Sequence, residues 1–234
     1  MKKTGKIWIV IVIVMLVLII ALGSGAFFIY SAATDLTDAD KINTEKSYAI
    51  LEPLLKSVVL GEEQAISNDE INGVLAAVMN TYTESLEKSD TKDTLVAKGA
   101  SVYLSDNESA KIYADLYYND IRFIFTAEAF IKLDAESQTI IFNIKNTKIG
   151  SLPIPTTFIM SKLDESLRNI SDQLDVDGDN IIIPSEYTIN ILEKDITLKI
   201  NQLEISNNSA KVQTTSAMEA IEGVFDDFLK GIIG

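Results

Sequence analysis

Apolar residues follow three different patterns along this chain, and the first pattern is a continuous run. Ile7 to Tyr30 are 24 consecutive residues without a charged side chain, and Trp8 and Tyr30 stand at its two ends. As a helix this run spans roughly 36 Å, more than the hydrocarbon core of about 30 Å in a typical bilayer. Aromatic rings at the ends of such a run are typical of membrane interfaces. The pattern therefore predicts one transmembrane helix over residues 7–30.

The charges that flank this run predict its orientation. Three lysines lie within residues 1–6, and the first acidic residue after the run is Asp35. Because positive residues are enriched on the cytoplasmic side, we expect residues 1–6 in the cytoplasm and residues 31–234 outside a plasma membrane. A cleaved signal peptide is the alternative, with the small residues 31–33 as its cleavage site. The apolar region of a signal peptide is typically only about 7–15 residues long, which favours an uncleaved anchor.

The second pattern is helical spacing, and it follows a polar segment. Residues 31–43 are polar and acidic and are interpreted as a linker. Glu45–Leu60 carries apolar residues three and four positions apart, which predicts a helix, with Pro53 as a kink or in a first turn. Linker and helix together form a juxtamembrane region over residues 31–66.

A clearer helix begins at Ser67. Ser67 and Glu70 have the S-x-x-E spacing of a capping box, and Ile66 is placed to act as a hydrophobic staple. An apolar stripe then continues to about residue 88, formed by Ile71, Val74, Leu75, Val78 and Tyr82.

The third pattern is alternation with a period of two, which begins near Leu95 and predicts β-strands. In the strongest strand, Ile121–Leu133, every odd-numbered residue is apolar, and Ile124 and Phe130 are the apolar exceptions on the other side. This sidedness predicts that an aspartate at Phe123 or Phe125 unfolds the domain, whereas Arg122→Asp is tolerated. Short turns join these strands, so they should pair as antiparallel neighbours. The expected turns are Asp106-Asn107, Asn119-Asp120 and Ala135-Glu136.

The last third of the chain returns to mixed patterns after the break at Gly150–Pro155. The two prolines form either a rigid strand-to-helix connection, with Pro155 at the helix start, or the lip of a groove. The elements expected afterwards are a helix from Phe158 to near Gln173, strands at Ile181–Ile183 and Tyr187–Leu192, a hairpin over Thr197–Thr214 with its turn at Asn207-Asn208, and a C-terminal amphipathic helix over residues 217–234.

These elements predict an α+β protein. We expect an N-terminal transmembrane helix followed by a curved antiparallel β-meander packed on helices. The extracytoplasmic α+β domain covers residues 67–216, and the C-terminal helix is expected to cover part of its core.

Composition limits the chemistry. The three lysines before the run are part of 20 basic residues, and all 34 acidic residues follow it, so residues 31–234 carry a net charge of −17. Such a surface repels phosphate backbones, so we expect no nucleic-acid partner. The chain has no cysteine and no histidine. This excludes disulfides, thiol nucleophiles and imidazole acid–base groups. We predict no enzyme, no catalytic residues and no cofactor.

Three segments carry a resemblance to a known family. They are the capped helix around Ile71–Leu75, the strands that follow it, and Lys148–Pro155, which leads to Phe158 and contains the pattern I-G-x-L-P-I-P-x-x-F. Together they resemble the YpmS-like family of membrane-anchored proteins of Gram-positive bacteria. The resemblance covers roughly residues 66–214 and the anchor, and it implies location and architecture rather than an activity.

An acidic loop is the most pointed candidate for a metal site. Counted from Asp175, acids stand at positions 1, 3, 5 and 12, as in a calcium-binding loop: Asp175, Asp177, Asp179 and Glu186. Position 6 is Asn180 rather than glycine, and Pro184 in the strand-like sequence that follows argues against a helix there. We therefore favour a turn leading into a short strand, with calcium binding as the alternative.

The leading functional hypothesis is a non-enzymatic envelope domain that binds a lipid or a lipid-linked envelope ligand. An apolar sheet packed under helices can hold acyl chains in a groove, although this is an argument by analogy between folds. The residues expected to line the groove are Phe123, Phe125, Ile154, Phe158 and Leu163. The alternative is a protein-interaction or sensing module of the cell envelope, which could respond to calcium. Membrane contact is expected through residues 7–30, and the sequence does not indicate an oligomeric state.

Overall fold

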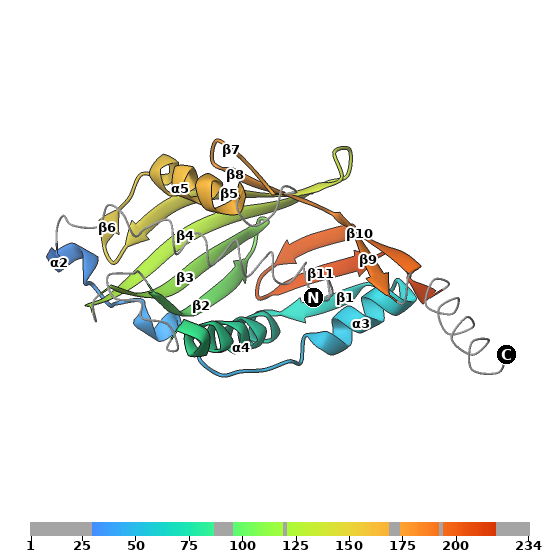
Figure 1. Cartoon of the computed structure of the whole chain (residues 1–234), viewed down its shortest axis with the longest axis horizontal. Helices are drawn as coiled ribbons and strands as arrows, with labels where there is room; N and C mark the ends of the chain where they lie inside the picture. The colour runs from blue at the N-terminus through green and yellow to red at the C-terminus, as the bar shows by residue number, and fades with distance from the viewer. Residues whose placement is uncertain (1–29, 87–95, 119–120, 169–173, 192–193, 219–234) are drawn as a thin grey trace.

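The computed structural model describes residues 30–86, 96–118, 121–168, 174–191 and 194–218 of an α+β protein (Figure 1). All pairings between the described strands are antiparallel. The helices are α2 (Tyr30–Ala33), the 3₁₀ turn η2 (Ala39–Lys41), α3 (Leu51–Leu60), α4 (Asn68–Leu86) and α5 (Thr156–Arg168).

The larger sheet contains the predicted meander. Its strand order is β2-β3-β4-β5-β8-β7, with the short β6 beside β5. The strands are β2 (Val96–Ser105), β3 (Ser109–Tyr118), β4 (Ile121–Asp134), β5 (Thr139–Ile149), β6 (Leu152–Pro153), β7 (Asp175–Asp177) and β8 (Asn180–Pro184). The predicted turns after β2 and β4 are confirmed, and Asn119-Asp120 lies outside the described residues.

A second, smaller sheet corrects the expectation of one continuous meander. Its strand order is β1-β11-β10-β9. The strands are β1 (Gln64–Ser67), β9 (Glu186–Ile191), β10 (Lys194–Ser206) and β11 (Ser209–Thr214). The predicted closing hairpin turns at Asn208, which has a positive φ of 64°. It pairs with β1, a strand that was not predicted because four residues are too few for a period to be visible.

Two helix predictions have different outcomes. The capping box of α4 is confirmed, since the Ser67 backbone N–H donates to Glu70 Oε2 at 2.7 Å and the Glu70 N–H donates to Ser67 Oγ at 3.3 Å. The helix expected from Glu45 begins only at Leu51, with Pro53 in its first turn. The residues before it are extended, because they pack against the larger sheet and α4, as described below.

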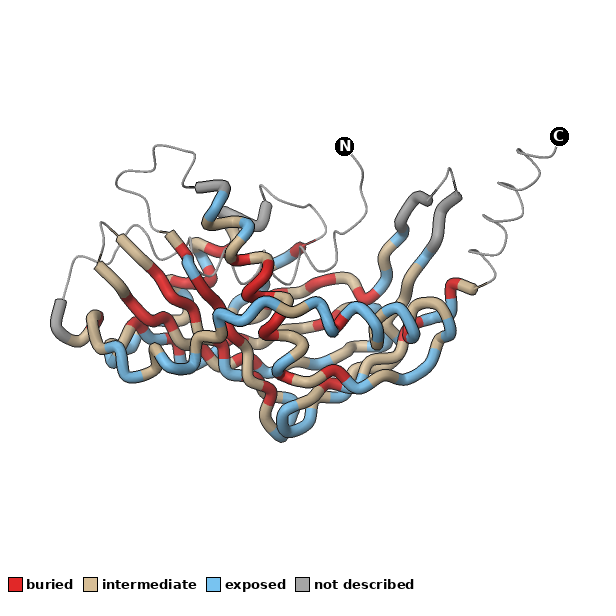
Figure 2. Tube along the Cα trace, turned by 90° about the horizontal axis from the view of Figure 1, so that it is seen from below, coloured by how far each residue is buried: buried red, intermediate tan, exposed pale blue. Residues whose placement is uncertain are grey.

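One hydrophobic core lies on the inner face of the larger sheet, where α4 and α5 both pack (Figure 1). Leu75 and Met79 of α4 and Ile159 and Leu163 of α5 join the same cluster as the inward residues of the strands. Figure 2 shows this buried band running through the strands, with exposed chain around it.

The predicted anchor lies almost wholly outside the described residues, which begin at its last residue, Tyr30. Within the described ranges, no helix has both the length and the hydropathy that a bilayer span requires. The described chain starts with α2 at one end of the long axis, and α3 and the smaller sheet lie toward the other end (Figure 1).

Candidate functional site

The five residues predicted to line a groove are brought together by the fold. Phe123 and Phe125 point inward from β4, and Ile154, Phe158 and Leu163 come from the connection before α5 and from α5 itself. All five belong to or pack against the same core. Phe125 and Leu163 have an exposed fraction of 0%, and Ile154 and Phe158 are only partly buried.

The middle strands give this core a floor of small side chains. The register places Ala100, Ala114 and Phe125 in one row across β2, β3 and β4, and Ala110 beside Ala129 in another. These residues are buried. Alanine side chains are short and leave space above the sheet. How tightly the core is packed here therefore depends on the side chains that α4 and α5 place over them.

Burial decreases toward the end of β3 and β4 that faces α2. The last paired residues there are Tyr118 and Ile121, and both are only partly buried, as are Tyr82 and Phe158. The residues one row further in are buried from solvent: Phe123 is 8% exposed and Leu116 is 1% exposed. This end of the core is therefore apolar, partly aromatic and within reach of solvent.

The segment before α3 lies across the larger sheet and α4, and we call residues 30–50 the strap. The backbone N–H of Ser151 donates to Ala32 O at 3.0 Å, and the N–H of Asn43 donates to Ser101 Oγ at 2.7 Å. Tyr103 Oη donates to Lys41 O at 2.8 Å. Residues 31–43, interpreted above as a linker, are therefore not free chain, because the sheet binds their backbone.

Three glycines make this contact sterically possible. A Cβ atom on Gly99 would lie 2.6 Å from Ile42 Cγ2, and one on Gly73 would lie 2.5 Å from Ser47 Cβ. On Gly150, which has a positive φ of 55°, a Cβ would collide with the carbonyl oxygen of Ala32. No other residue type fits at such distances without moving the strap.

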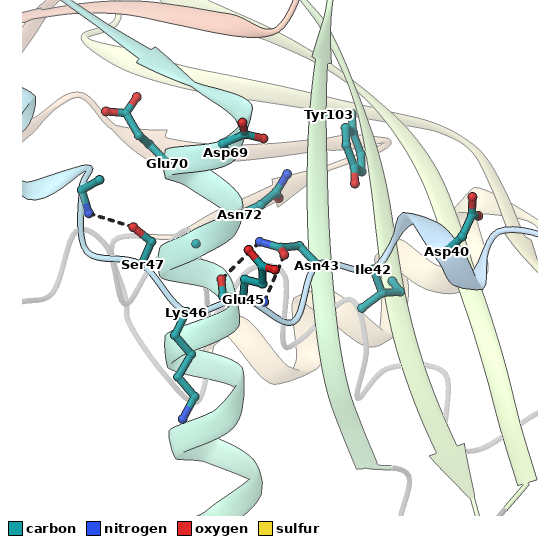
Figure 3. A pocket seen from close by; sticks show the side chains of 12 residues that line it. Asp40, Ile42, Asn43, Glu45, Lys46, Ser47, Asp69, Glu70, Asn72 and Tyr103 are labelled. Carbon is teal, nitrogen blue, oxygen red and sulfur yellow. Dashed lines mark hydrogen bonds between the residues drawn. The ribbon is translucent and has the colours of Figure 1, made fainter.

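A hollow of about 500 Å³ lies between the strap and the first half of α4 (Figure 3). Four carboxylates line it, those of Asp40, Glu45, Asp69 and Glu70. Three of the lining side chains are already held by bonds within the protein: Asn72 bonds the backbone of Val102, Tyr103 bonds the strap, and Glu70 caps α4. These three side chains therefore hold together the strap, β2 and the first turn of α4.

Asn68 and Asn72 close the edge of the larger sheet. Asn72 accepts from the Val102 N–H at 2.7 Å and donates to the Val102 carbonyl at 2.9 Å, as a neighbouring strand would do. Asn68, one helical turn earlier, accepts from the Leu104 N–H at 2.9 Å. Edge strands with free backbone groups invite pairing with other chains, and these two amides prevent it at β2.

On the outer face of the sheet, Arg122 forms a bidentate pair with Asp115. The distances are 2.7 Å from Nε to Oδ1 and 3.1 Å from Nη2 to Oδ2. The hydrogen bond from Arg122 to Asp115 raises the pKa of Arg122 above its ordinary value. Alternation placed Arg122 correctly on the outer side of the strand, but it did not reveal that the partner carboxylate is largely buried.

The acidic loop forms the turn that the sequence favoured. Asp177 pairs with Asn180 across a two-residue hairpin of Gly178 and Asp179, and Gly178 has a positive φ of 58°. Glu186 lies on β9, in the other sheet. Among the described residues, no group of three or more acidic side chains is arranged to hold a metal ion.

The strap and its glycine track are the parts of the site that sequence reasoning missed. Gly73 stands inside a helical pattern and Gly99 inside a strand pattern, where glycine normally lowers stability. A glycine at such a position is a signal of close backbone approach, although it does not say which segment approaches.

Comparison with family models, with curated proteins and with solved structures finds no match for this chain. The resemblance to the YpmS-like family therefore stays a prediction from the sequence.

Proposed function

We propose that this chain is a single-pass membrane protein whose extracytoplasmic domain binds an apolar chain of a lipid or lipid-linked envelope ligand. The ligand would lie over the inner face of the larger sheet, between α4 and α5. The observation that carries this proposal is the partly buried, aromatic end of the core, formed by Tyr82, Tyr118, Ile121 and Phe158.

The position of this opening relative to the anchor supports the proposal. The Gly150 N–H donates to the carbonyl of Ile124 at 2.7 Å, and Gly150 touches Ala32 of the strap. The chain leaves the predicted membrane helix at Tyr30, only two residues before Ala32. A domain held in this way presents the open end of its core toward the bilayer from which a lipid would come.

The strap fixes the orientation of the domain relative to the predicted membrane helix. A flexible linker would let the domain rotate freely above the membrane. Here the backbone of the strap is hydrogen-bonded at Ala32, Lys41, Asn43 and Ser47 to groups of the domain. The opening is thereby kept on the membrane side, which a domain that accepts lipid requires.

No reaction is part of this proposal. Binding of an acyl chain needs apolar surface and a path to it, and neither requires acid–base chemistry. Phe125 and Leu163 are closed off, so a chain enters by separating the partly buried residues at the open end and advancing over the alanine floor.

Photocrosslinking tests this proposal on the full chain in phosphatidylglycerol vesicles that contain a lipid with a diazirine in its acyl chain. We expect labelled peptides from β4 and α5, in addition to those from residues 7–30. Ile121→Trp should fill the opening and remove the label from β4 and α5, whereas Phe130→Trp on the outer face should not. Label confined to residues 7–30 would contradict lipid binding by the domain.

A further inference from the structure

An exposed apolar stripe on α3 is the least expected surface of the described chain. Leu51 and Leu55 are 48% and 60% exposed, the partly buried Val59 continues their line along the helix, and Tyr48 at the end of the strap, just before α3, is 61% exposed. The opposite side of α3 is the one that packs: Ile50 and Ser57 are fully buried against the smaller sheet. The helix therefore turns its larger apolar side away from the domain, which is unusual for a surface helix.

The chain after β11 passes directly beside this helix. Ala217 N–H donates to Val58 O at 2.8 Å, and Ser216 Oγ donates to Val59 O at 2.8 Å. Ser57 Oγ in turn accepts from the Thr214 N–H at 3.0 Å. These bonds fix the start of the C-terminal segment, residues 218–234, at the end of the stripe.

A helix is expected to begin at this point. The Met218 N–H donates to Ser216 Oγ at 3.2 Å, which is the bond of a helix N-cap, and Glu219 gives the S-x-x-E spacing of a capping box. In helical spacing, the apolar residues fall on one side: Met218, Ile221, Phe225, Phe228, Leu229 and Ile232. The polar side carries Glu222, Asp226 and Lys230.

We infer that the C-terminal segment binds the α3 stripe, apolar side against apolar side, as the second helix of an α-helical hairpin. A helix of residues 218–234 is about 26 Å long and α3 from Leu51 to Leu60 is about 15 Å long, so the segment is long enough to cover the stripe. The contact has the i, i+3, i+4 and i+7 spacing of paired helices on both sides.

Two other occupants are less suitable. In the proposed orientation the bilayer would adjoin α2, and α3 lies toward the other end of the long axis (Figure 1). A second copy would meet a strip that is one helix wide, far less than the about 800 Å² per partner of a stable interface. A tethered segment acts at an effective concentration on the order of millimolar, so it prevails over a second copy at ordinary concentrations.

Engineered cysteines test this inference, since the chain has none of its own. Leu55→Cys is combined with Ile221→Cys or Phe225→Cys, the apolar positions that an antiparallel segment starting beside Val58 brings closest to it, in the full chain in detergent, and disulfides are mapped by mass spectrometry after mild oxidation. Lys56→Cys with the same partners is the matched control, because it lies on the adjacent charged side of α3. Mixing ¹⁴N- and ¹⁵N-labelled protein before oxidation separates bonds within one molecule from bonds between two.

We expect a disulfide from position 55 within one molecule, at least five-fold more than from position 56. Disulfides that join the two isotopes would overturn the inference in favour of a second copy on the stripe. Equal yields at positions 55 and 56, or free thiols at both positions, would also overturn it. An independent measurement uses a polarity-sensitive dye attached to the Leu55→Cys variant: adding Phe225→Asp with Phe228→Asp should shift its emission to the red, and an unchanged emission would contradict coverage by the segment.

Discussion

The two sheets of this protein differ in how completely neighbouring elements cover their faces and bond their free polar groups. The larger sheet has α4 and α5 on its inner face, the strap across its outer side and two asparagine amides along its free edge. The helix packed on the smaller sheet is α3, in which Leu51, Leu55 and Leu60 are exposed. Near the junction of the sheets, the hydroxyls of Ser185 and Tyr187 are buried without a hydrogen-bond partner in the described chain.

This difference implies that the well-packed part and the incompletely packed part of the protein are two separate regions. Buried hydroxyls without a partner lower stability, and Ser185 and Tyr187 lie at or beside the smaller sheet. The larger sheet and its helix α4 have the bidentate Arg122–Asp115 pair, the packed core and the close contacts of Gly73, Gly99 and Gly150 with the strap. Mutations should therefore be costly in the larger sheet and mild in the smaller one.

The largest effect is expected in the core of the larger sheet. Phe125→Asp places a charge without a partner in a fully buried site and should lower the free energy of unfolding by more than about 4 kcal/mol. Lys132→Asp, on the exposed side of the same strand, should stay within about 0.5 kcal/mol of wild type. Urea unfolding of the detergent-solubilised full chain measures both. Similar loss in the two variants would remove the argument from sidedness.

The next effect concerns the outer face. Arg122→Asp leaves the largely buried Asp115 without its partner and adds a second negative charge beside it, so we expect a loss of about 2–4 kcal/mol. This corrects the tolerance that alternation alone predicts for Arg122. Restoring a salt bridge with the exchanged pair Asp115→Arg and Arg122→Asp should recover part of the loss. If Arg122→Asp alone were as stable as wild type, the pair with Asp115 would not contribute to stability.

The strap contact gives a prediction in which two effects oppose each other. Gly73→Ala should stabilise α4 by about 1 kcal/mol through helix propensity. Its Cβ would however lie 2.5 Å from Ser47 Cβ, and such overpacking typically costs about 1–3 kcal/mol. We expect a net loss and faster proteolysis of the strap. Adding Ser47→Gly removes the facing Cβ and should recover part of the loss; a gain from Gly73→Ala alone would mean that the strap is not held here.

The smallest effect is expected for Tyr187 of the smaller sheet. Tyr187→Phe removes a hydroxyl that has no partner, so the free energy of unfolding should be unchanged or up to about 1 kcal/mol higher. Tyr103→Phe is the matched control, because its hydroxyl donates to Lys41 of the strap, and it should lose about 0.5–1.5 kcal/mol. Equal losses in both variants would contradict the difference between the sheets.

Tyr187 also predicts a dependence on pH. Burial raises the pKa of Tyr187 to about 12. The folded protein keeps this proton between about pH 10 and 12, whereas the unfolded chain loses it, so the contribution to stability is complete below about pH 10 and decreases across this window. Burial also raises the pKa of Tyr82 and of Tyr113, so absorbance titration of the phenols should show a late component that becomes smaller by one group in Tyr187→Phe. A single transition near about pH 10 in both proteins would contradict the burial of this side chain.

The sequence alone determined the features that depend on neighbours along the chain. The capping box at Ser67 and Glu70, the strand order β2-β3-β4-β5 and the hairpin turn at Asn208 follow from short-range spacing, and the structure has all three. The inward side of β4 was also readable, because alternation with a period of two fixes which side chains share a face. The same patterns predict the membrane helix over residues 7–30, of which the described residues include only Tyr30.

Only the tertiary structure decided which distant segments meet. Gly73, Gly99 and Gly150 lie far apart in sequence, and their common role appears only where Ser47, Ile42 and Ala32 pass over them. The assignment of β1 to the smaller sheet and the partner of Arg122 also depend on contacts between distant residues. Local spacing carries no information about such contacts, because they are selected by the packing of whole elements and not by any period along one of them.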